Sequence, residues 1–282
     1  MAILDDFRQF FAASITASIG IAERNGRLES AFAATPREHF VHEGPWRVFT
    51  PVGYIQTPSK NPALLYQDIL VAIDERRHIN IGQPSLHAGS LAAVNVKEGE
   101  RVIQVGAGSG YYTAVLAHLV GVRGEVVAYE LEQDLATQAA KNLADLSHVQ
   151  VLNRSGSLGA LPPCDVIYVC AGATGPVDAW LEALRPGGRL VFPLTPAEGL
   201  GGMLLTTRTS AEGFEARFIS RAMFVPCADA RDAETADKLS KAFLRDDMWQ
   251  VKSLRWNSAP DDSCWVAGRT WWLSKSPVVH EN

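Results

Sequence analysis

The sequence predicts an α/β fold with a doubly wound, mostly parallel sheet. Three observations indicate it: short apolar runs alternate with predicted helices over residues 85–193, a glycine-rich turn follows the first run, and an acidic residue ends the second. Short buried strands that alternate with helices are typical of βαβ units, which bind ligands at the carboxyl ends of their strands. Antiparallel edge strands and extensions at both ends of the chain complete the predicted Rossmann-like architecture.

The N-terminal region is predicted to form two packed helices. Apolar residues recur at mainly helical spacing over residues 4–21 and 28–33, with a break at Asn25-Gly26. Residues 35–62 are rich in proline, glycine and aromatic residues, which favours irregular structure with little regular pairing. Long structured loops of this kind often line functional sites.

The remaining elements follow in the order expected for βαβ units. Helices are predicted at residues 85–94, 111–120, 133–146, 177–184 and 233–244. Parallel strands are predicted at residues 101–105, 125–129, 149–152, 166–170 and 188–193, and antiparallel edge strands at 202–208, 214–221 and 223–225. A Trp-rich stretch follows at residues 265–273. We therefore predict N-terminal helices and substrate-side loops over residues 1–90, a Rossmann-like core over 91–226, and an extension packed on the core over 227–282.

Composition restricts the class of protein. The chain has 26 basic and 31 acidic residues, a net charge of −5, so no global attraction to nucleic acid or an anionic membrane is expected. None of the four cysteines has C-x-x-C spacing or a nearby histidine cluster, so no metal site is expected. Asp5 and Asp6 precede the apolar run 10–21, which is too short to span a bilayer and lacks the basic start of a signal peptide. These features predict a cytoplasmic protein.

The strongest local signal is a glycine turn between a predicted strand and a predicted helix. The strand leads into Gly106-Ala107-Gly108-Ser109-Gly110, where glycine lets the backbone turn sharply and approach a ligand. Tyr111 takes the place of the third glycine of the dinucleotide fingerprint, which argues against NAD and for S-adenosylmethionine (SAM), a ligand without a pyrophosphate. Glu130 ends the next predicted strand, where a carboxylate can accept both ribose hydroxyls. A tight turn without a ligand is the alternative explanation of the glycines alone.

With these motifs, the sequence resembles the protein-L-isoaspartate O-methyltransferase family. Residues 101–116 are similar to the first SAM motif of that family. Further similarities occur in the family's order at residues 81–84, 124–126, 130, 154–156, 164–169, 184–190 and 224–226. The resemblance implies a carboxyl O-methyltransferase that uses SAM, releases S-adenosylhomocysteine (SAH) and acts on a carboxylate of a peptide or small molecule.

The resemblance also implies where SAM binds: over the glycine turn, with Glu130 on its ribose and the Ser155-Gly156 turn beside its adenine. The expected cofactor-binding residues are Gln104, Gly106, Ala107, Gly108, Ser109, Gly110, Tyr111, Glu130, Leu131, Ser155 and Gly156. Gln104 and Ser155 depart from the family, which usually has acidic residues there. Both replacements can still form hydrogen bonds.

The acceptor side departs further. The family's I-S-x-P motif has a hydroxyl residue that helps seat the isoaspartyl carboxylate, and this chain has Gly82 there. The expected substrate-binding residues are Gly82, Gln83, Pro84 and Tyr54. Ser85 is the candidate replacement hydroxyl, and its alternative is a helix-start residue that binds backbone N–H groups. Trp46, Phe49 and Tyr54 are expected either to line the substrate mouth or to pack in the core.

Methyl transfer from a sulfonium is an in-line displacement, so the protein mainly aligns the two reactants. A carboxylate acceptor needs no general base, whereas a hydroxyl or amine acceptor does, and His87 is then the best placed base. Ser85 and His87 are therefore the candidate catalytic residues, with a packed helix histidine as the alternative for His87. Two other functions stay open: a SAM-binding module without catalysis, suggested by the departures at Gly82, Gln104 and Ser155, and, more distantly, an NAD dehydrogenase. The sequence leaves the oligomeric state open.

Overall fold

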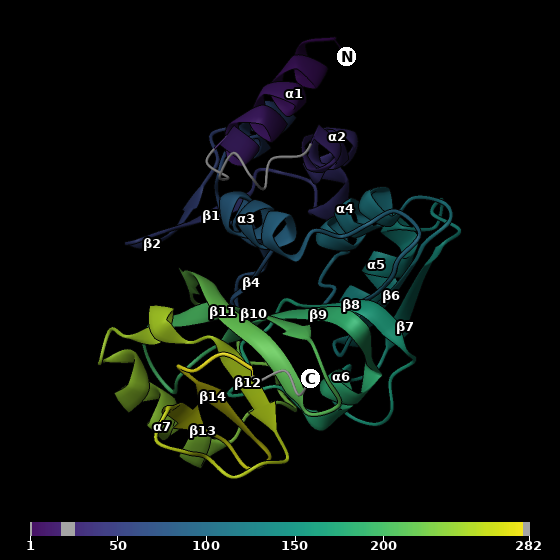
Figure 1. Cartoon of the computed structure of the whole chain (residues 1–282). Coiled ribbons are helices and arrows are strands. Elements are labelled where there is room, and N and C mark those ends of the chain that lie inside the picture. The colour runs from purple at the N-terminus through teal and green to yellow at the C-terminus, as the bar shows by residue number, and fades with distance from the viewer. Residues whose placement is uncertain (1, 18–25, 279–282) are drawn as a thin grey trace. The chain divides into compact units, whose positions relative to one another are not determined.

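The computed structural model describes residues 2–17 and 26–278. Its contacts group the chain into two compact units. Unit 1 comprises residues 1–101 and 107–154, and unit 2 comprises residues 102–106 and 155–282. In Figure 1 most of unit 1 is drawn in purple to teal, and most of unit 2 in green to yellow. The predicted three-part division at residues 90 and 226 stays a prediction.

Unit 1 begins with two helices, α1 (Ala2–Ala17) and α2 (Gly26–Ala34), which confirm the two helices predicted at the N-terminus. α1 buries Phe11 while Phe10 is 75% exposed, because only one face of the helix packs against the neighbouring elements. The predicted apolar positions Ile19 and Ile21 lie outside the described residues.

The segment predicted to be irregular contains a hairpin, so the expectation of little regular pairing over residues 35–62 was wrong. β1 (Arg47–Thr50) and β2 (Gly53–Gln56) pair antiparallel. The short 3-10 helices η1 (Arg37–Phe40) and η2 (Pro62–Leu65) flank this hairpin. Proline and glycine occur at the turns of this segment. The strands between them are too short to show a clear alternation of apolar and polar residues.

A second antiparallel pair, also absent from the predictions, leads towards the predicted acceptor-side motif. It consists of β3 (Ala72–Asp74) and β4 (Ile79–Asn80). We call residues 72–80 the β3–β4 hairpin. It ends at Asn80, two residues before Gly82, and the next helix begins at Pro84.

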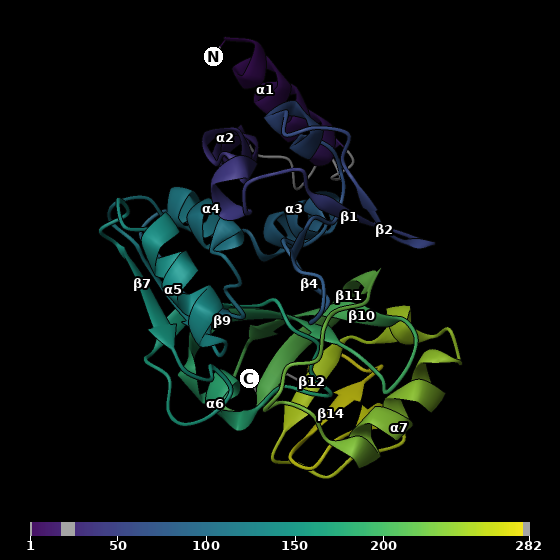
Figure 2. The same cartoon turned by 180° about the vertical axis from the view of Figure 1, so that it is seen from behind.

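The rest of unit 1 confirms the predicted helices and strands. In chain order these are α3 (Pro84–Val94), α4 (Tyr111–Val120), β6 (Glu125–Glu130), α5 (Gln133–Asn142) and β7 (Val149–Asn153). β6 and β7 pair in parallel, and Figure 2 shows α5 alongside them. α5 ends at Asn142, earlier than residue 146, because Leu143 leaves the helical conformation with φ −108° and ψ 8°.

Unit 2 contains a mixed sheet with its parallel strands at one side. β5 (Arg101–Val105) pairs in parallel with β8 (Cys164–Val169), and β8 pairs in parallel with β9 (Leu184–Leu194). α6 (Asp178–Ala183) connects β8 to β9. Its fully buried Trp180 packs on Phe192 of β9, with ring centroids 5.9 Å apart. The parallel strands and flanking helices confirm the Rossmann-like α/β prediction.

Antiparallel strands extend this sheet. β10 (Gly201–Arg208) and β11 (Gly213–Ala222) confirm two of the three predicted antiparallel strands. Their predicted edge position was wrong, because β11 also pairs with a later strand at residues 253–256 and both strands lie inside the sheet. The third, at residues 223–225, was wrong: β11 ends at Ala222, and Val225 instead accepts a hydrogen bond from Gly172 N at 2.7 Å. Pro226 has no N–H to continue a ladder.

The C-terminal extension continues the sheet. It contains α7 (Ala233–Phe243), η3 (Met248–Gln250), β12 (Ser253–Trp256), β13 (Cys264–Ala267) and β14 (Trp271–Ser274). The strand order is β13-β14-β12-β11-β10-β9-β8-β5 in this unit, and Figure 1 shows α7 beside β13. The Trp-rich stretch therefore forms sheet structure, with Trp265 edge-on to Phe218 of β11 at 5.4 Å between ring centroids.

Candidate functional site

The glycine loop between β5 and α4 has a backbone that other residues rarely adopt. Gly106, Gly108 and Gly110 have φ angles of +82°, +56° and +95°. A Cβ on Gly110 would also lie 2.9 Å from Leu143 Cδ1, at the end of α5. The three glycines that the sequence singled out are therefore required by the conformation of this loop.

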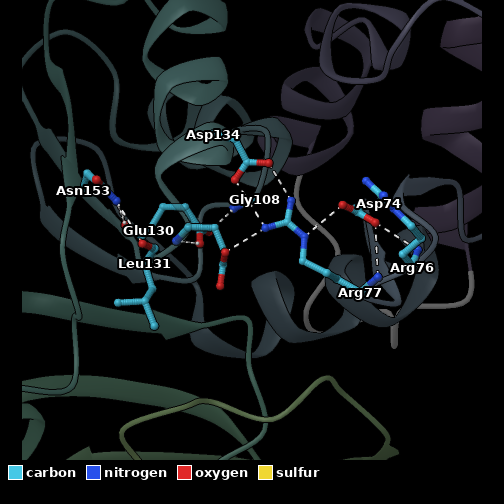
Figure 3. A network of polar contacts seen from close by, with 9 residues as sticks. Asp74, Arg76, Arg77, Gly108, Glu130, Leu131, Asp134 and Asn153 are labelled. Carbon is cyan, nitrogen blue, oxygen red and sulfur yellow. Dashed lines mark hydrogen bonds and ion pairs between the residues drawn. The ribbon is translucent and has the colours of Figure 1, made fainter.

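Glu130, the last residue of β6, binds the glycine loop directly (Figure 3). Gly108 N donates to its Oε2 at 2.7 Å, and Glu132 N donates to its Oε1 at 3.0 Å. Only 7% of Glu130 is exposed, and this burial raises the pKa of its carboxyl above the ordinary value, against the lowering effect of the backbone N–H groups of Gly108, Leu131 and Glu132. Each carboxylate oxygen has a further lone pair, so Glu130 can still accept hydroxyl hydrogens.

Asn153, at the end of β7, fixes the backbone beside Glu130. Its Nδ2 donates to the carbonyl oxygens of Glu130 and Leu131, both at 3.0 Å (Figure 3). The side chain of Leu131 is 49% exposed. Sequence reasoning missed Asn153, although it directly precedes the predicted adenine turn at the end of a predicted strand.

The other loop residues of unit 1 are more deeply buried. Ala107 N donates to Tyr129 O at 3.1 Å. Ser109 is 2% exposed, and its Oγ has no hydrogen-bond partner in the described ranges 2–17 and 26–278. Tyr111 is 1% exposed and packs edge-on against Phe40, with ring centroids 5.6 Å apart. The ring of Tyr111 therefore lies in the hydrophobic core.

Unit 2 contains the remaining predicted cofactor residues. Gln104 of β5 is 1% exposed, and its Nε2 donates to Cys170 Sγ at 3.5 Å. In the predicted adenine turn, Ser155 Oγ accepts from Ser157 N at 3.2 Å, and Gly156 O accepts from Trp180 Nε1 at 2.8 Å. Trp180 was not predicted to support this turn, because it lies 24 residues further along the chain.

On the predicted acceptor side, the start of α3 binds a carboxylate from its own chain. Ser85 N donates to Asp68 Oδ1 at 2.8 Å, and Ser85 Oγ donates to Asp68 Oδ2 at 2.6 Å. Gln83 Nε2 donates to the same Oδ2 at 3.1 Å, and Pro84 is the first residue of the helix. Asp68 was not predicted, because nothing near it in the sequence indicates a partner 17 residues away.

Arg37 holds the loop that presents Asp68. Its Nη1 donates to the carbonyl oxygens of Leu65 and Gln67 at 2.6 and 2.7 Å, and its Nη2 donates to that of Ile69 at 3.0 Å. Arg37 is completely buried. The residues before and after Asp68 in this loop are therefore both held by Arg37.

The space beside Gly82 is filled by two rings. His87 stacks on Tyr112 with ring centroids 3.6 Å apart and an interplanar angle of 13°. A Cβ on Gly82 would lie 2.6 Å from His87 Nε2 and 2.8 Å from Tyr112 Cε2, and the φ of Gly82 is +88°. The hydroxyl side chain of the family motif therefore does not fit here. His87 is 2% exposed, and burial lowers its pKa to about 3.

The predicted aromatic residues of the substrate mouth differ in their positions. Trp46 is 3% exposed and packs in the core, whereas Phe49 is 41% exposed. Phe49 and Tyr54 pack edge-on across the β1–β2 hairpin, with ring centroids 5.3 Å apart. Tyr54 OH donates to Asn80 Oδ1 of β4 at 2.8 Å.

Parallel strands, a glycine loop after β5 and a carboxylate at the end of β6 define the class of Rossmann-like proteins that bind a nucleoside cofactor. The profile of the family described as protein-L-isoaspartate(D-aspartate) O-methyltransferase matches residues 18–232. The chain belongs to this family.

Two relatives illustrate the similarity in sequence. A protein-L-isoaspartate O-methyltransferase of Brucella anthropi is 31% identical over 71% of this chain and 84% of its own length. Protein-L-isoaspartate O-methyltransferase 2 of Marinobacter nauticus is 34% identical over 79% of this chain and 93% of its own length. The family resemblance of the sequence is thereby confirmed.

Solved structures confirm the fold. A protein-L-isoaspartate O-methyltransferase is similar with a TM-score of 0.67 and 22% identity, over 84% of this chain and 69% of its own. A Plasmodium falciparum protein assigned as a protein-L-isoaspartate O-methyltransferase, solved with SAH, is similar with a TM-score of 0.63 and 19% identity, over 79% of this chain and 98% of its own.

Two features are absent from the residues that the structure describes. None of the helices there is long and apolar enough to cross a membrane. No group of three or more His, Cys, Asp or Glu side chains in the same ranges could hold a metal ion.

Proposed function

We propose that this chain transfers the methyl group of SAM to a carboxylate of a peptide, with the isoaspartyl carboxylate as the first acceptor. The observation that carries this proposal is the carboxylate of Glu130, bound to the glycine loop through Gly108 N at 2.7 Å in a chain of this family. The relatives above are named for the same reaction.

The residues of the site fit the cofactor. When bound, SAM supplies a methyl group on a sulfonium, which an acceptor attacks directly. We infer that Glu130 accepts the ribose hydroxyls and that the backbone of residues 106–111 lies against the cofactor, beside Leu131. The ring of Tyr111 is buried in the core, so only its backbone is proposed to take part. The turn Ser155-Gly156 is the proposed adenine site, and Gln104 is proposed to replace the family's acidic residue.

A carboxylate acceptor is favoured over a hydroxyl or an amine. Either of the latter must lose a proton, and His87 is the candidate base. With a pKa lowered to about 3 by burial, His87 is a weak base at neutral pH. A carboxylate is already ionised and needs no proton transfer, so the burial of His87 does not impede its methylation.

The start of α3 supports the same acceptor. Ser85 offers an N–H and a hydroxyl to the carboxylate of Asp68, and Gln83 offers its amide. Donors of this kind are those that a substrate carboxylate requires, and in the structure the carboxylate of Asp68 accepts from all three. We therefore propose that the acceptor side is formed by Gln83 and Ser85. Their sequence neighbours Gly82 and Pro84 are proposed to take part, as is Tyr54, which binds Asn80 of β4.

The experiment is an incubation with labelled SAM and two peptides that differ only in one residue, isoaspartyl in one and aspartyl in the other. We expect a base-labile methyl ester on the isoaspartyl peptide and none on its aspartyl control. Absence of methyl ester from every member of a panel of carboxylate acceptors would contradict the proposal.

A second candidate, a SAM-binding interaction module without catalysis, is favoured by one observation. The two rings beside Gly82 occupy the space of the family's hydroxyl side chain. Tight binding of SAH, measured by titration calorimetry, together with no product on carboxylate, hydroxyl or amine acceptors would support this candidate. Any robust methylated product excludes it.

Cofactor affinity is expected to fall as the pH is lowered from neutral through the raised pKa of Glu130. Burial raises the pKa of Glu130, and its protonated form loses acceptor capacity for the ribose hydroxyls. The effect on the free energy of unfolding has the opposite sign, because a raised carboxyl pKa stabilises the fold at low pH and this contribution is lost as the pH rises through the folded pKa. Calorimetry with SAH across this range checks the prediction, and an unchanged Kd contradicts it.

We also propose a cytoplasmic location. All four cysteines are free, and two of them are buried, which supports a reducing compartment. Fractionation of cells that express the chain tests this location.

A further inference from the structure

The β3–β4 hairpin lies against the glycine loop. A Cβ on Gly108 would be 3.6 Å from Ile73 Cδ1 of β3, so the side chain of Ile73 packs beside Gly108. The turn of this hairpin contains four consecutive charged residues, Asp74 to Arg77. The proposed function assigns no role to this turn.

Arg77 connects the turn to the chain that follows Glu130 (Figure 3). Its Nε lies 2.9 Å from Asp74 Oδ2. Its Nη1 lies 2.7 Å from Glu132 Oε2, and its Nη2 lies 2.5 Å from Asp134 Oδ2. A single guanidinium therefore joins one carboxylate of the hairpin to two carboxylates that are 55 and 57 residues away in sequence.

The two distant carboxylates belong to the segment that positions Glu130. Glu132 donates its backbone N–H to Glu130 Oε1 at 3.0 Å. Asp134 lies in the first turn of α5, which begins at Gln133. A displacement of residues 132–134 would therefore move the carboxylate proposed to bind the ribose.

The arrangement is stronger than a single surface ion pair, which contributes little on its own. Arg77 binds Asp134 through both terminal nitrogens, since Nη1 also lies 3.3 Å from Asp134 Oδ1. The side chain of Asp74 is 18% exposed and that of Arg77 is 33% exposed, so water screens their contact only partly. Without Arg77, three carboxylates would repel one another, and Glu132 already disfavours the charged form of Glu130.

We propose that Arg77 is a positioning residue that fastens the β3–β4 hairpin to residues 130–134 and thereby sets the affinity for SAM and SAH. This inference rests on the proposed function, because it assumes that Glu130 binds the ribose. The same hairpin leads into Gly82 and α3, so Arg77 also links the cofactor side of the site to its acceptor side.

The experiment measures binding of SAH and SAM to the full chain by titration calorimetry at low and high salt. We expect Arg77→Met to weaken SAH binding about tenfold at low salt, as the loss of a network of charged hydrogen bonds implies. The affinity of the wild type should fall with added salt towards that of the variant, whose own affinity should change little.

Arg76→Met is the matched control. Arg76 is the exposed neighbour of Arg77, and its replacement removes the same charge from the same turn. SAM has one more positive charge than SAH, so loss of a distant positive charge would strengthen SAM binding relative to SAH. A positioning role instead predicts that Arg77→Met weakens both ligands by the same factor, and that Arg76→Met weakens neither.

A double-mutant cycle with Asp134→Asn keeps the proposal testable if Arg77→Met folds poorly. Asp134 is 62% exposed and has no assigned contact with the cofactor. We expect Asp134→Asn to weaken SAH binding about threefold in the wild type. In the Arg77→Met background the same substitution should weaken SAH binding by a smaller factor.

The outcomes separate the two proposals. A wild type that binds SAH while Arg77→Met and Asp134→Asn bind it equally well overturns the role of Arg77 alone. Equal weakening by Arg76→Met also overturns it. A wild type that binds no SAH overturns the proposed function, and this inference with it.

Discussion

Replacement of Glu130 with glutamine is expected to weaken the binding of SAM and SAH about 100-fold, which corresponds to about 2.7 kcal/mol. The carboxylate of Glu130 accepts from Gly108 N and Glu132 N through different oxygens. An amide has only one oxygen, so its NH2 group would face one of these N–H donors. The variant also loses the charge that strengthens hydrogen bonds to the ribose hydroxyls, each worth about 1.5–3 kcal/mol.

The control for this variant is Glu125→Gln, the same chemical change at the other end of β6. Glu125 forms an ion pair with Arg101 at 2.7 Å, and its side chain is 41% exposed. Its replacement should leave the Kd for SAH unchanged in calorimetry. A Glu130→Gln variant that binds SAH within about fivefold of the wild type would disprove the assignment of Glu130 to the ribose. The same variant should also lose the pH dependence of binding.

Introduction of the family's hydroxyl, Gly82→Ser, is expected to destabilise the protein by about 3 kcal/mol and not to increase methyl transfer. The φ of Gly82 is +88°, and a side chain in this region costs about 1–2 kcal/mol. Its Cβ would also collide with His87 Nε2 at 2.6 Å, and overpacking of this kind costs about 1–3 kcal/mol. Either the stacked rings or the helix start must move.

Gly89→Ser in the same helix is the matched control, because a Cβ there has nothing within 4 Å. Its free energy of unfolding in denaturant titrations should stay close to that of the wild type. In the His87→Ala background the imidazole is gone, but the backbone strain at position 82 remains. Gly82→Ser should therefore destabilise His87→Ala, but by less than it destabilises the wild type. A Gly82→Ser variant as stable as the wild type, or more active on the isoaspartyl peptide, would refute this account.

The cofactor side could be predicted from local sequence. Gly106, Gly108 and Gly110 require positive φ, and Glu130 follows at the end of the next strand. A strand, a tight turn and a helix are decided largely by neighbours in the chain, and strand ends meet at one edge of a parallel sheet. The pattern therefore located the glycine loop and its carboxylate without knowledge of distant contacts.

The acceptor side could not be predicted in the same way. Its donors at Gln83 and Ser85 were identified, but not Asp68, which binds them, nor Arg37, which holds the loop around Asp68. The obstacle at Gly82 was equally hidden. A glycine in the sequence shows that a side chain is missing, but not that two rings occupy the space it would need.

The chain's own pattern of apolar runs, glycines and a carboxylate determined the Rossmann-like class, the glycine loop and the family. Tertiary structure decided which polar groups meet: Arg77 with Asp134, Ser85 with Asp68, and Trp180 with the Gly156 carbonyl. The physical reason is range. Backbone geometry is set over a few residues, whereas these side-chain contacts join positions 17 to 57 residues apart that only the folded chain brings together.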